Sequence, residues 1–166
     1  MANSYDVRKL PRTWASDIQI TGAAASGDLR AKILSQTIAT VPTAAGTTEG
    51  IFIMPAAGTI TAVKAAFKDA LAAHDTNYAE FKLINKGQAG AGTTNLLATG
   101  SGVNTTKITG GSAIAAYTRY EMTLSVTAAD LEVLKHDVLV FQVIGNGTLA
   151  NTLTLGRCQL HLAVTS

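Results

Sequence analysis

The sequence predicts an all-β protein: a jelly-roll-like β-sandwich or barrel that carries an extended N-terminal arm. From Lys32 onward, short apolar runs alternate with turn residues at the spacing of strands. The chain also lacks a convincing βαβ repeat and has few helical segments, which favours a closed or two-layered β fold. At 166 residues it is long enough for one sizeable core, so we expect an arm over residues 1–30 and a single β domain over residues 31–166.

The arm differs from the rest of the chain in composition. It holds four of the 13 Lys and Arg residues, the single Trp and a Gly/Ala/Ser-rich link over residues 22–27. It carries too many apolar residues to leave in water without a partner: Tyr5, Val7, Leu10, Trp14, Ile18 and Ile20. Two placements remain open, an edge strand across its own domain or a segment ordered against another subunit, and we favour the second.

Three strands are predicted early in the domain. Residues 32–41 and 78–85 each alternate two sets of side chains, as a strand with two different faces does. Residues 50–54 (GIFIM) form a short β-rich run that Pro55 ends, and the following PAAG is a predicted turn.

The segment from Gly58 to Tyr78 fits two structures. Its apolar residues recur at intervals of three and four, which is one stripe of a helix: Ile60, Val63, Phe67, Ala70, Leu71 and His74. Its first half is rich in Thr, Ile and Val, which fits a pleated surface equally well. Since a helix here would be isolated among strands, we predict a strand over residues 58–69 and a turn over residues 70–77.

The second half of the domain contains a long segment of small and polar residues, from Lys86 to Ala113. Its length predicts short strands within it. The elements expected from here to the C-terminus are short strands at 95–99 and 105–109, a strand at 119–126 with Tyr120, Met122, Leu124 and Val126 on one face, one helical turn within 129–134, a central strand at 137–146, and a last strand at 152–164 with a bulge at Gly156 or Arg157.

Charge and cysteine content exclude several classes of protein. Only 14% of the residues are charged, against about 25% in an average protein, so part of the surface is expected to be uncharged or covered by other subunits. The net charge of +2 provides no strong field for nucleic acid, and no apolar run is long enough for a transmembrane helix, so we expect neither nucleic acid nor membrane as a partner. The lone Cys158 and the absence of an apolar signal core agree with folding in a reducing cytosol.

No motif in the sequence predicts an enzyme, a cofactor or a metal site. The glycines of residues 87–92 (GQAGAG) do not match a phosphate-binding loop, and no G-x-S-x-G motif is present. The three histidines are not spaced as metal ligands, and Cys158 is expected to be a small buried apolar residue. Aromatic residues are too few for a typical glycosidase groove, and the Asp75-Thr76-Asn77 cluster indicates a turn more readily than a cation site.

Several stretches resemble the head decoration, or cement, proteins of tailed bacteriophages, which have a jelly-roll-like β fold. They are residues 55–94, residues 105–111, the LEVLKHDVL run at 131–139 and residues 147–154. The resemblance extends over roughly Lys32 to the C-terminus, with one departure: His136-Asp137 stands where relatives often show Gly-Asp before the strand. It implies a virion protein on the outer surface of the capsid, made in the cytoplasm of the host bacterium. Such proteins commonly form homotrimers that tie neighbouring major capsid protein subunits together.

The role of the arm in binding is inferred from its composition and not from the resemblance. We expect apolar anchors and cations of the arm to bind the capsid or another subunit: Tyr5, Arg8, Lys9, Leu10, Arg12, Trp14, Ile18 and Ile20. The chief competing hypothesis is a virion-associated jelly-roll module that binds a glycan or receptor, such as a tail-fibre or lectin-like domain. An enzyme of unrecognised type and an unrelated assembly protein also remain open.

Overall fold

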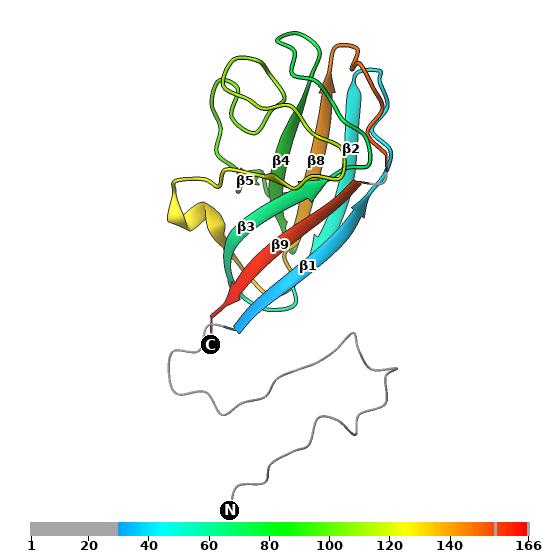
Figure 1. Ribbon diagram of the computed structural model, residues 1–166. Helices are drawn as coiled ribbons and strands as arrows, with labels where there is room; N and C mark the ends of the chain where they lie inside the picture. Colours follow the sequence, from blue (N-terminus) through cyan, green and yellow to red (C-terminus); the bar gives the residue numbers. More distant parts are fainter. Residues whose placement is uncertain (1–29, 155, 166) are drawn as a thin grey trace, which may run out of the picture.

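The computed structural model describes residues 30–154 and 156–165, which form two antiparallel sheets packed face to face (Figure 1). The strands are β1 (Arg30–Ile38), β2 (Gly46–Ile53), β3 (Gly58–Ala66), β4 (Tyr78–Gly87), β5 (Thr94–Asn95), β6 (Tyr120–Glu121), β7 (Glu132–Val133), β8 (Val138–Asn146) and β9 (Gly156–Val164). The predicted all-β sandwich is confirmed. Residues 1–29 of the predicted arm lie outside the described residues.

The order of the strands is that of a jelly roll. One sheet has the order β1-β9-β3-β6, with β7 also pairing with β3, and the other has the order β2-β8-β4-β5. The strand pairs are nested in sequence: β1 pairs with β9, β2 with β8, and β4 with β5. The first half of the chain therefore pairs with the second half in reverse order, as in a jelly roll. In Figure 1 the strands β1, β9 and β3 cross in front of β2, β8 and β4.

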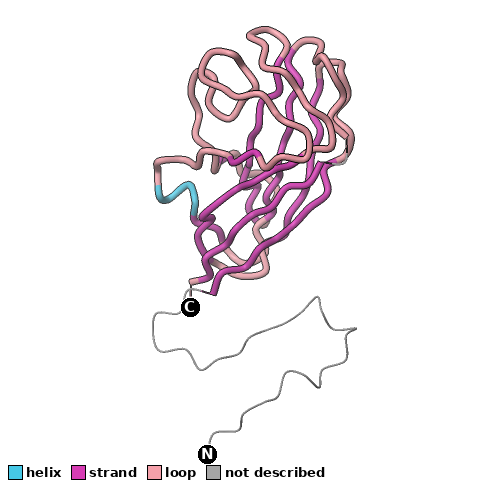
Figure 2. The backbone as a smooth tube through the Cα atoms, viewed as in Figure 1, coloured by secondary structure: helices cyan, strands magenta, loops and turns pink. Residues whose placement is uncertain are grey.

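The two ends of the sandwich differ. The turn between β2 and β3 is short, and it lies beside the start of β1 and the end of β9, because Gly58 and Arg30 both pair with Val164. Long connections gather at the opposite end, where Figure 2 shows most of the loops. We call these the terminal end and the loop end.

The segment from Gly58, which fits both a helix and a strand by its sequence, is strand β3, as predicted. Ile60 and Val63 are both fully buried although they are three positions apart, because the pairing of β3 with β9 shifts register between Ile60 and Ala62. This β-bulge places side chains three residues apart on one face of a strand and so imitates helical spacing. The residues after β3 form the predicted turn, with Leu71 paired to Ile114 by an isolated bridge.

The prediction of a bulge in the last strand is wrong. A bulge was expected at Gly156 or Arg157, but β9 begins at Gly156 and pairs with β1 without a shift. The irregularity lies in the partner strand β3. Leu153 is buried through a separate bridge to Val41 and does not belong to β9.

Three predicted strands in the loop segments are much shorter than expected. Only Tyr120–Glu121 is strand within 119–126, and Val126, predicted on one face with Tyr120, Met122 and Leu124, is 98% exposed whereas Met122 is 4% exposed. Within 95–99 and 105–109, Asn95 ends strand β5, and only Leu97 and Thr105 form further bridges. Side chains take over backbone hydrogen bonds here, which ends the regular pairing. The helical turn expected within 129–134 is a single 3₁₀ turn at Ala128–Leu131.

The core between the sheets contains a row of aromatic rings. Phe81 lies at its centre, with ring centroids 6.2 Å from Phe67, 5.3 Å from Tyr120 and 6.2 Å from Phe141. These rings come from both sheets, so they join the two layers directly.

Asp69 connects the end of β3 to the segment before β9. Its carboxylate accepts hydrogen bonds from the backbone N–H of Thr154 at 2.8 Å and from the Thr154 hydroxyl. These bonds to the ionised form, the hydroxyl bond first, lower the pKa of Asp69 below its usual value of 3.8.

Replacing Gly58 should destabilise the fold strongly. A Cβ at Gly58 would clash with the carbonyl oxygen of Ala163, in the backbone of the neighbouring strand. We expect Gly58→Ala to lower the free energy of unfolding by about 2–3 kcal/mol, measured by urea denaturation. Gly46→Ala is the matched control, because a Cβ there meets nothing within 4 Å. Equal effects of the two substitutions would contradict the close approach at Gly58.

The Asp69 contact should make stability depend on pH in the acid range. Because folding lowers the pKa of Asp69, its contribution is present above about 3.8 and is lost as the pH falls through the lower folded value. Asp69→Asn should therefore lower the urea midpoint more at about pH 6 than at about pH 2.5. Thr154→Val, which removes the hydroxyl donor, should show the same trend. A difference independent of pH would contradict this role.

Candidate functional site

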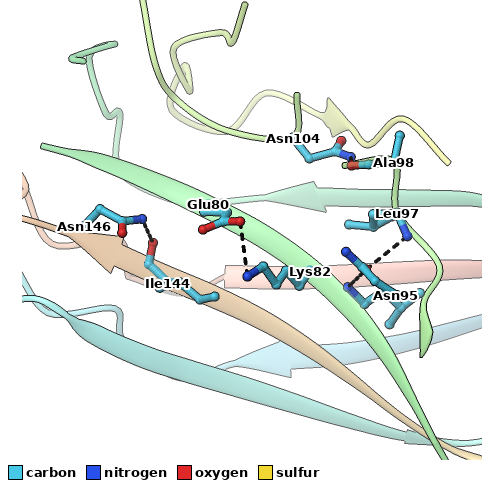
Figure 3. A network of polar contacts seen from close by, with 9 residues as sticks. Glu80, Lys82, Asn95, Leu97, Ala98, Asn104, Ile144 and Asn146 are labelled. Atoms are coloured by element: carbon cyan, nitrogen blue, oxygen red, sulfur yellow. Dashed lines mark hydrogen bonds and ion pairs between the residues drawn. The ribbon is translucent and has the colours of Figure 1, made fainter. Parts of the chain in front are cut away.

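The outer face of the β2-β8-β4-β5 sheet is polar toward the loop end. Glu49 on β2 accepts a hydrogen bond from Gln142 on β8 at 2.8 Å, and Lys82 on β4 forms an ion pair with Glu80 at 3.3 Å. Figure 3 shows the Glu80–Lys82 pair beside the hydrogen bond from Asn146 to Ile144. This half has the solvent-facing side chains that are usual on an antiparallel sheet.

Toward the terminal end the same face becomes aliphatic. Outward-facing side chains of three neighbouring strands meet there, and we call them the aliphatic patch: Ile51, Ile53, Ile84, Val138 and Val140. Val140 pairs with Ile51 on one side and Ile84 on the other, so it is only 6% exposed although it faces away from the core. Ile51 and Ile53 on the edge strand remain 54% and 64% exposed.

The patch lies at the end of the sandwich where the described chain begins. Ile53 ends β2, and the following turn leads to Gly58, which pairs with Val164 beside Arg30. The segment that precedes Arg30 therefore joins the sandwich at the terminal end, where the patch is also found.

A polar hollow of about 320 Å³ opens on the loop segments. Its lining includes Asn104, Gly110, Ser112, Arg119, Glu121 and Thr123. Arg119 and Glu121 form an ion pair at 3.5 Å. Tyr120 lines the hollow too and donates a hydrogen bond to the carbonyl oxygen of Thr105 at 3.0 Å, while burial raises the pKa of its phenol.

Asn104 organises the segments around this hollow. Its amide nitrogen donates to the carbonyl oxygens of Ala98 and Thr123 at 3.0 and 2.9 Å, and its side-chain oxygen accepts from the N–H of Thr123 at 2.7 Å (Figure 3 shows the Ala98 contact). The residue is 7% exposed and has a φ of 53°, in the left-handed region that Asn tolerates better than most residues. The Asn104 side chain thus connects three loop segments, those that contain Ala98, Asn104 and Thr123.

The residues that could carry chemistry have structural roles in the described ranges. Cys158 is fully buried, and burial raises the pKa of its thiol, as expected for a small apolar core residue. His74 Nδ1 lies 3.2 and 3.0 Å from the backbone N–H groups of Thr76 and Asn77 and accepts from both. Asp75 and Asn77 accept from different loops, at Thr109 and Thr148, so their oxygens do not converge on a cation position. Within residues 30–154 and 156–165, no group of three or more His, Cys, Asp or Glu could hold a metal ion.

The glycine-rich run at residues 87–92 is the connection between two strands. Gly87 and Gly90 have φ values of 63° and 75°, and Gly92 donates to the carbonyl oxygen of Lys86 at 2.9 Å. The run joins β4 to β5 and leads into no helix.

All the arm residues predicted to bind lie outside the described residues: Tyr5, Arg8, Lys9, Leu10, Arg12, Trp14, Ile18 and Ile20. Sequence reasoning missed the aliphatic patch. The available signal was the continuous apolar character of GIFIM and DVLVFQVI, which leaves apolar side chains on both faces of a strand. Apolar residues on both faces predict a strand covered on both sides, and nothing among the described residues covers this outer face.

Compared with protein-family models, curated proteins and solved structures, the chain gives no match. No helix in the described ranges is long and apolar enough to span a membrane.

Asn104 is predicted to be a major contributor to stability. Asn104→Ala would remove the hydrogen bonds to the carbonyl oxygens of Ala98 and Thr123 and to the N–H of Thr123, and it would keep an unfavourable φ. We therefore expect a loss of about 2–3 kcal/mol in the free energy of unfolding. Asn104→Gly loses the same hydrogen bonds without the backbone strain and should be less destabilising than Asn104→Ala by about 1 kcal/mol. Urea denaturation measures both, and a stability equal to wild type in either variant would contradict the assignment.

Proposed function

We propose that this chain is a structural decoration, or cement, protein that binds the outer surface of a phage head and stabilises contacts between major capsid protein subunits. It acts as a homotrimer on the virion surface. The arm residues named above supply apolar anchors and cations for the capsid or a neighbouring subunit, and the jelly-roll sandwich supplies a rigid body.

The observation that carries the proposal is the turn before β8, within one of the stretches that resemble decoration proteins. His136 has a φ of 72°, a conformation that glycine adopts without strain, and the relatives often have Gly-Asp at this place. Asp137 next to it is buried and accepts from the Leu134 N–H at 2.9 Å and from the Asn85 amide at 3.0 Å. The departure in sequence therefore retains a backbone shape that suits the resemblance, and the Asp fixes the turn.

Low charge supports the same proposal. Subunits that pack closely on a shell are hindered by an excess of like charge, and this chain has a net charge of only +2. The aliphatic patch supports it as well, because an exposed apolar area on a sheet face is typical of a surface that meets another protein.

The polar hollow favours a second candidate, a glycan- or receptor-binding jelly-roll module. Its hydroxyl, carboxylate and guanidinium groups are the kinds that bind sugar hydroxyls. The number of copies on purified particles, from cryo-EM or gel densitometry, separates the two candidates. On the order of hundreds of copies on the shell are expected for cement. A few copies at the tail, with glycan binding lost in Arg119→Ala, would favour the second candidate and overturn the first.

Removing the arm should weaken capsid binding without unfolding the sandwich. Deletion of residues 2–29 leaves β1 and its pairing with β9 intact, so we expect the β circular dichroism spectrum and cooperative unfolding to persist. Co-sedimentation with undecorated capsids should show affinity reduced at least about 100-fold. Within the full chain, Trp14→Ala should weaken binding by about 30-fold and Ser16→Ala should not, since aromatic anchors dominate interfaces. Unchanged capsid binding after the deletion would rule out the arm as the attachment element.

A further inference from the structure

Two of the large exposed hydrophobic side chains lie next to each other in space. Ile51 and Ile53 are two residues apart on β2 and therefore face the same side, with Val140 and Val138 opposite them on β8. The other large exposed hydrophobics come from separate elements: Ile33, Ile108, Tyr117, Val126 and Leu134. The aliphatic patch is thus a continuous apolar surface across three strands, which is typical of an interaction site.

The patch borders a free sheet edge. β2 is the last strand of its sheet and pairs only with β8 among the described strands. The end of β1 approaches β2 near Gly50, where a Cβ would meet the side chain of Gln36, and the edge beyond Gly50 carries Ile51 and Ile53. An edge with unpaired backbone groups and an apolar face can accept an added strand.

We propose that residues 1–29 of a neighbouring copy occupy this edge, with the segment around Ile18 and Ile20 added to β2 and its apolar residues placed on the aliphatic patch. Residues 17–21 (DIQIT) alternate polar and apolar side chains, so Ile18 and Ile20 fall on one face of a strand, the spacing of Ile51 and Ile53. The inference rests on the homotrimer of the proposed function and identifies the surface that forms it.

Reach and area are adequate for this exchange. The segment enters the sandwich at the terminal end, where the patch lies, and residues 21–29 can span up to about 30 Å when extended. A stable interface needs on the order of 800 Å² from each partner, which is more than five aliphatic side chains provide. A 29-residue segment that includes Tyr5, Leu10, Trp14, Ile18 and Ile20 can supply it. Each copy gives one segment and receives one, so the contact can close in a ring, which in the proposed homotrimer has three members.

Trp14 makes the test direct, because it is the only Trp in the chain and its fluorescence reports the segment alone. In the purified full-length protein we expect a trimer by light scattering and a blue-shifted Trp14 emission. Ile53→Lys should shift the emission to the red and raise the concentration for half-dissociation at least about 30-fold. Ile33→Lys is the matched control, since Ile33 is 61% exposed against 64% for Ile53 but lies on the edge strand of the other sheet. If Ile53→Lys does not fold, Ile53→Thr keeps the β-branched shape and replaces it.

A cross-link distinguishes a neighbouring copy from the chain's own segment. Ile18→Cys and Ile51→Cys are placed on separate chains, mixed and oxidised, and a disulfide-linked pair of chains is expected only when segments are exchanged. A monomer with blue-shifted Trp14, or a trimer whose emission and stability do not respond to Ile53→Lys, would overturn the proposal. Because no capsid is present, these results do not depend on the copy-number experiment that tests the cement function.

Discussion

The fold depends on the pairing of the last described strand, β9, between β1 and β3. Nine residues of β9 pair with β1 without a break, and its other edge pairs with β3 through one bulge. These strands come from the two halves of the chain, so the sheet forms only when its ends meet. The second sheet repeats the pattern with β8 between β2 and β4. Pairs of such large sequence separation are costly to close, and the buried Phe81 cluster between the layers compensates for that cost.

Along β4, side chains replace the strand ladder. Asn95 accepts from the N–H groups of Leu83 and Leu97, both at 3.1 Å, and the Thr106 hydroxyl accepts from the Ala79 N–H at 2.8 Å. Together with Asn104 they bind loop segments to β4 beyond the short β5. Short polar side chains satisfy buried backbone groups without regular pairing, so these long connections have a defined shape. The polar hollow is therefore built from fixed walls.

The alternation of apolar and polar residues, together with the turn residues, was sufficient to predict the all-β fold class and most strands, because each strand has one face in the core. They failed where a side chain replaced the ladder, as at Asn104, since hydrogen bonding between distant segments leaves no period in the sequence. The helical stripe at Ile60 and Val63 shows the converse: one bulge changes the period from two to three. The aliphatic patch was missed for a third reason. An apolar run in β2 looks the same whether its outer face is covered by the chain itself or by another molecule.

The two apolar faces of β2 have different roles: one packs in the core and the other is exposed. Phe52 points into the core and is 5% exposed, so the sandwich depends on it, whereas Ile51 and Ile53 on either side of it contribute little to the core. Substitutions on the outer face can therefore alter association while the fold persists. A chain with few charges has little electrostatic means of keeping such a surface apart from other molecules. The edge of β2 is consequently the place where stability and assembly can be separated by mutation, since one strand supplies both through alternate side chains.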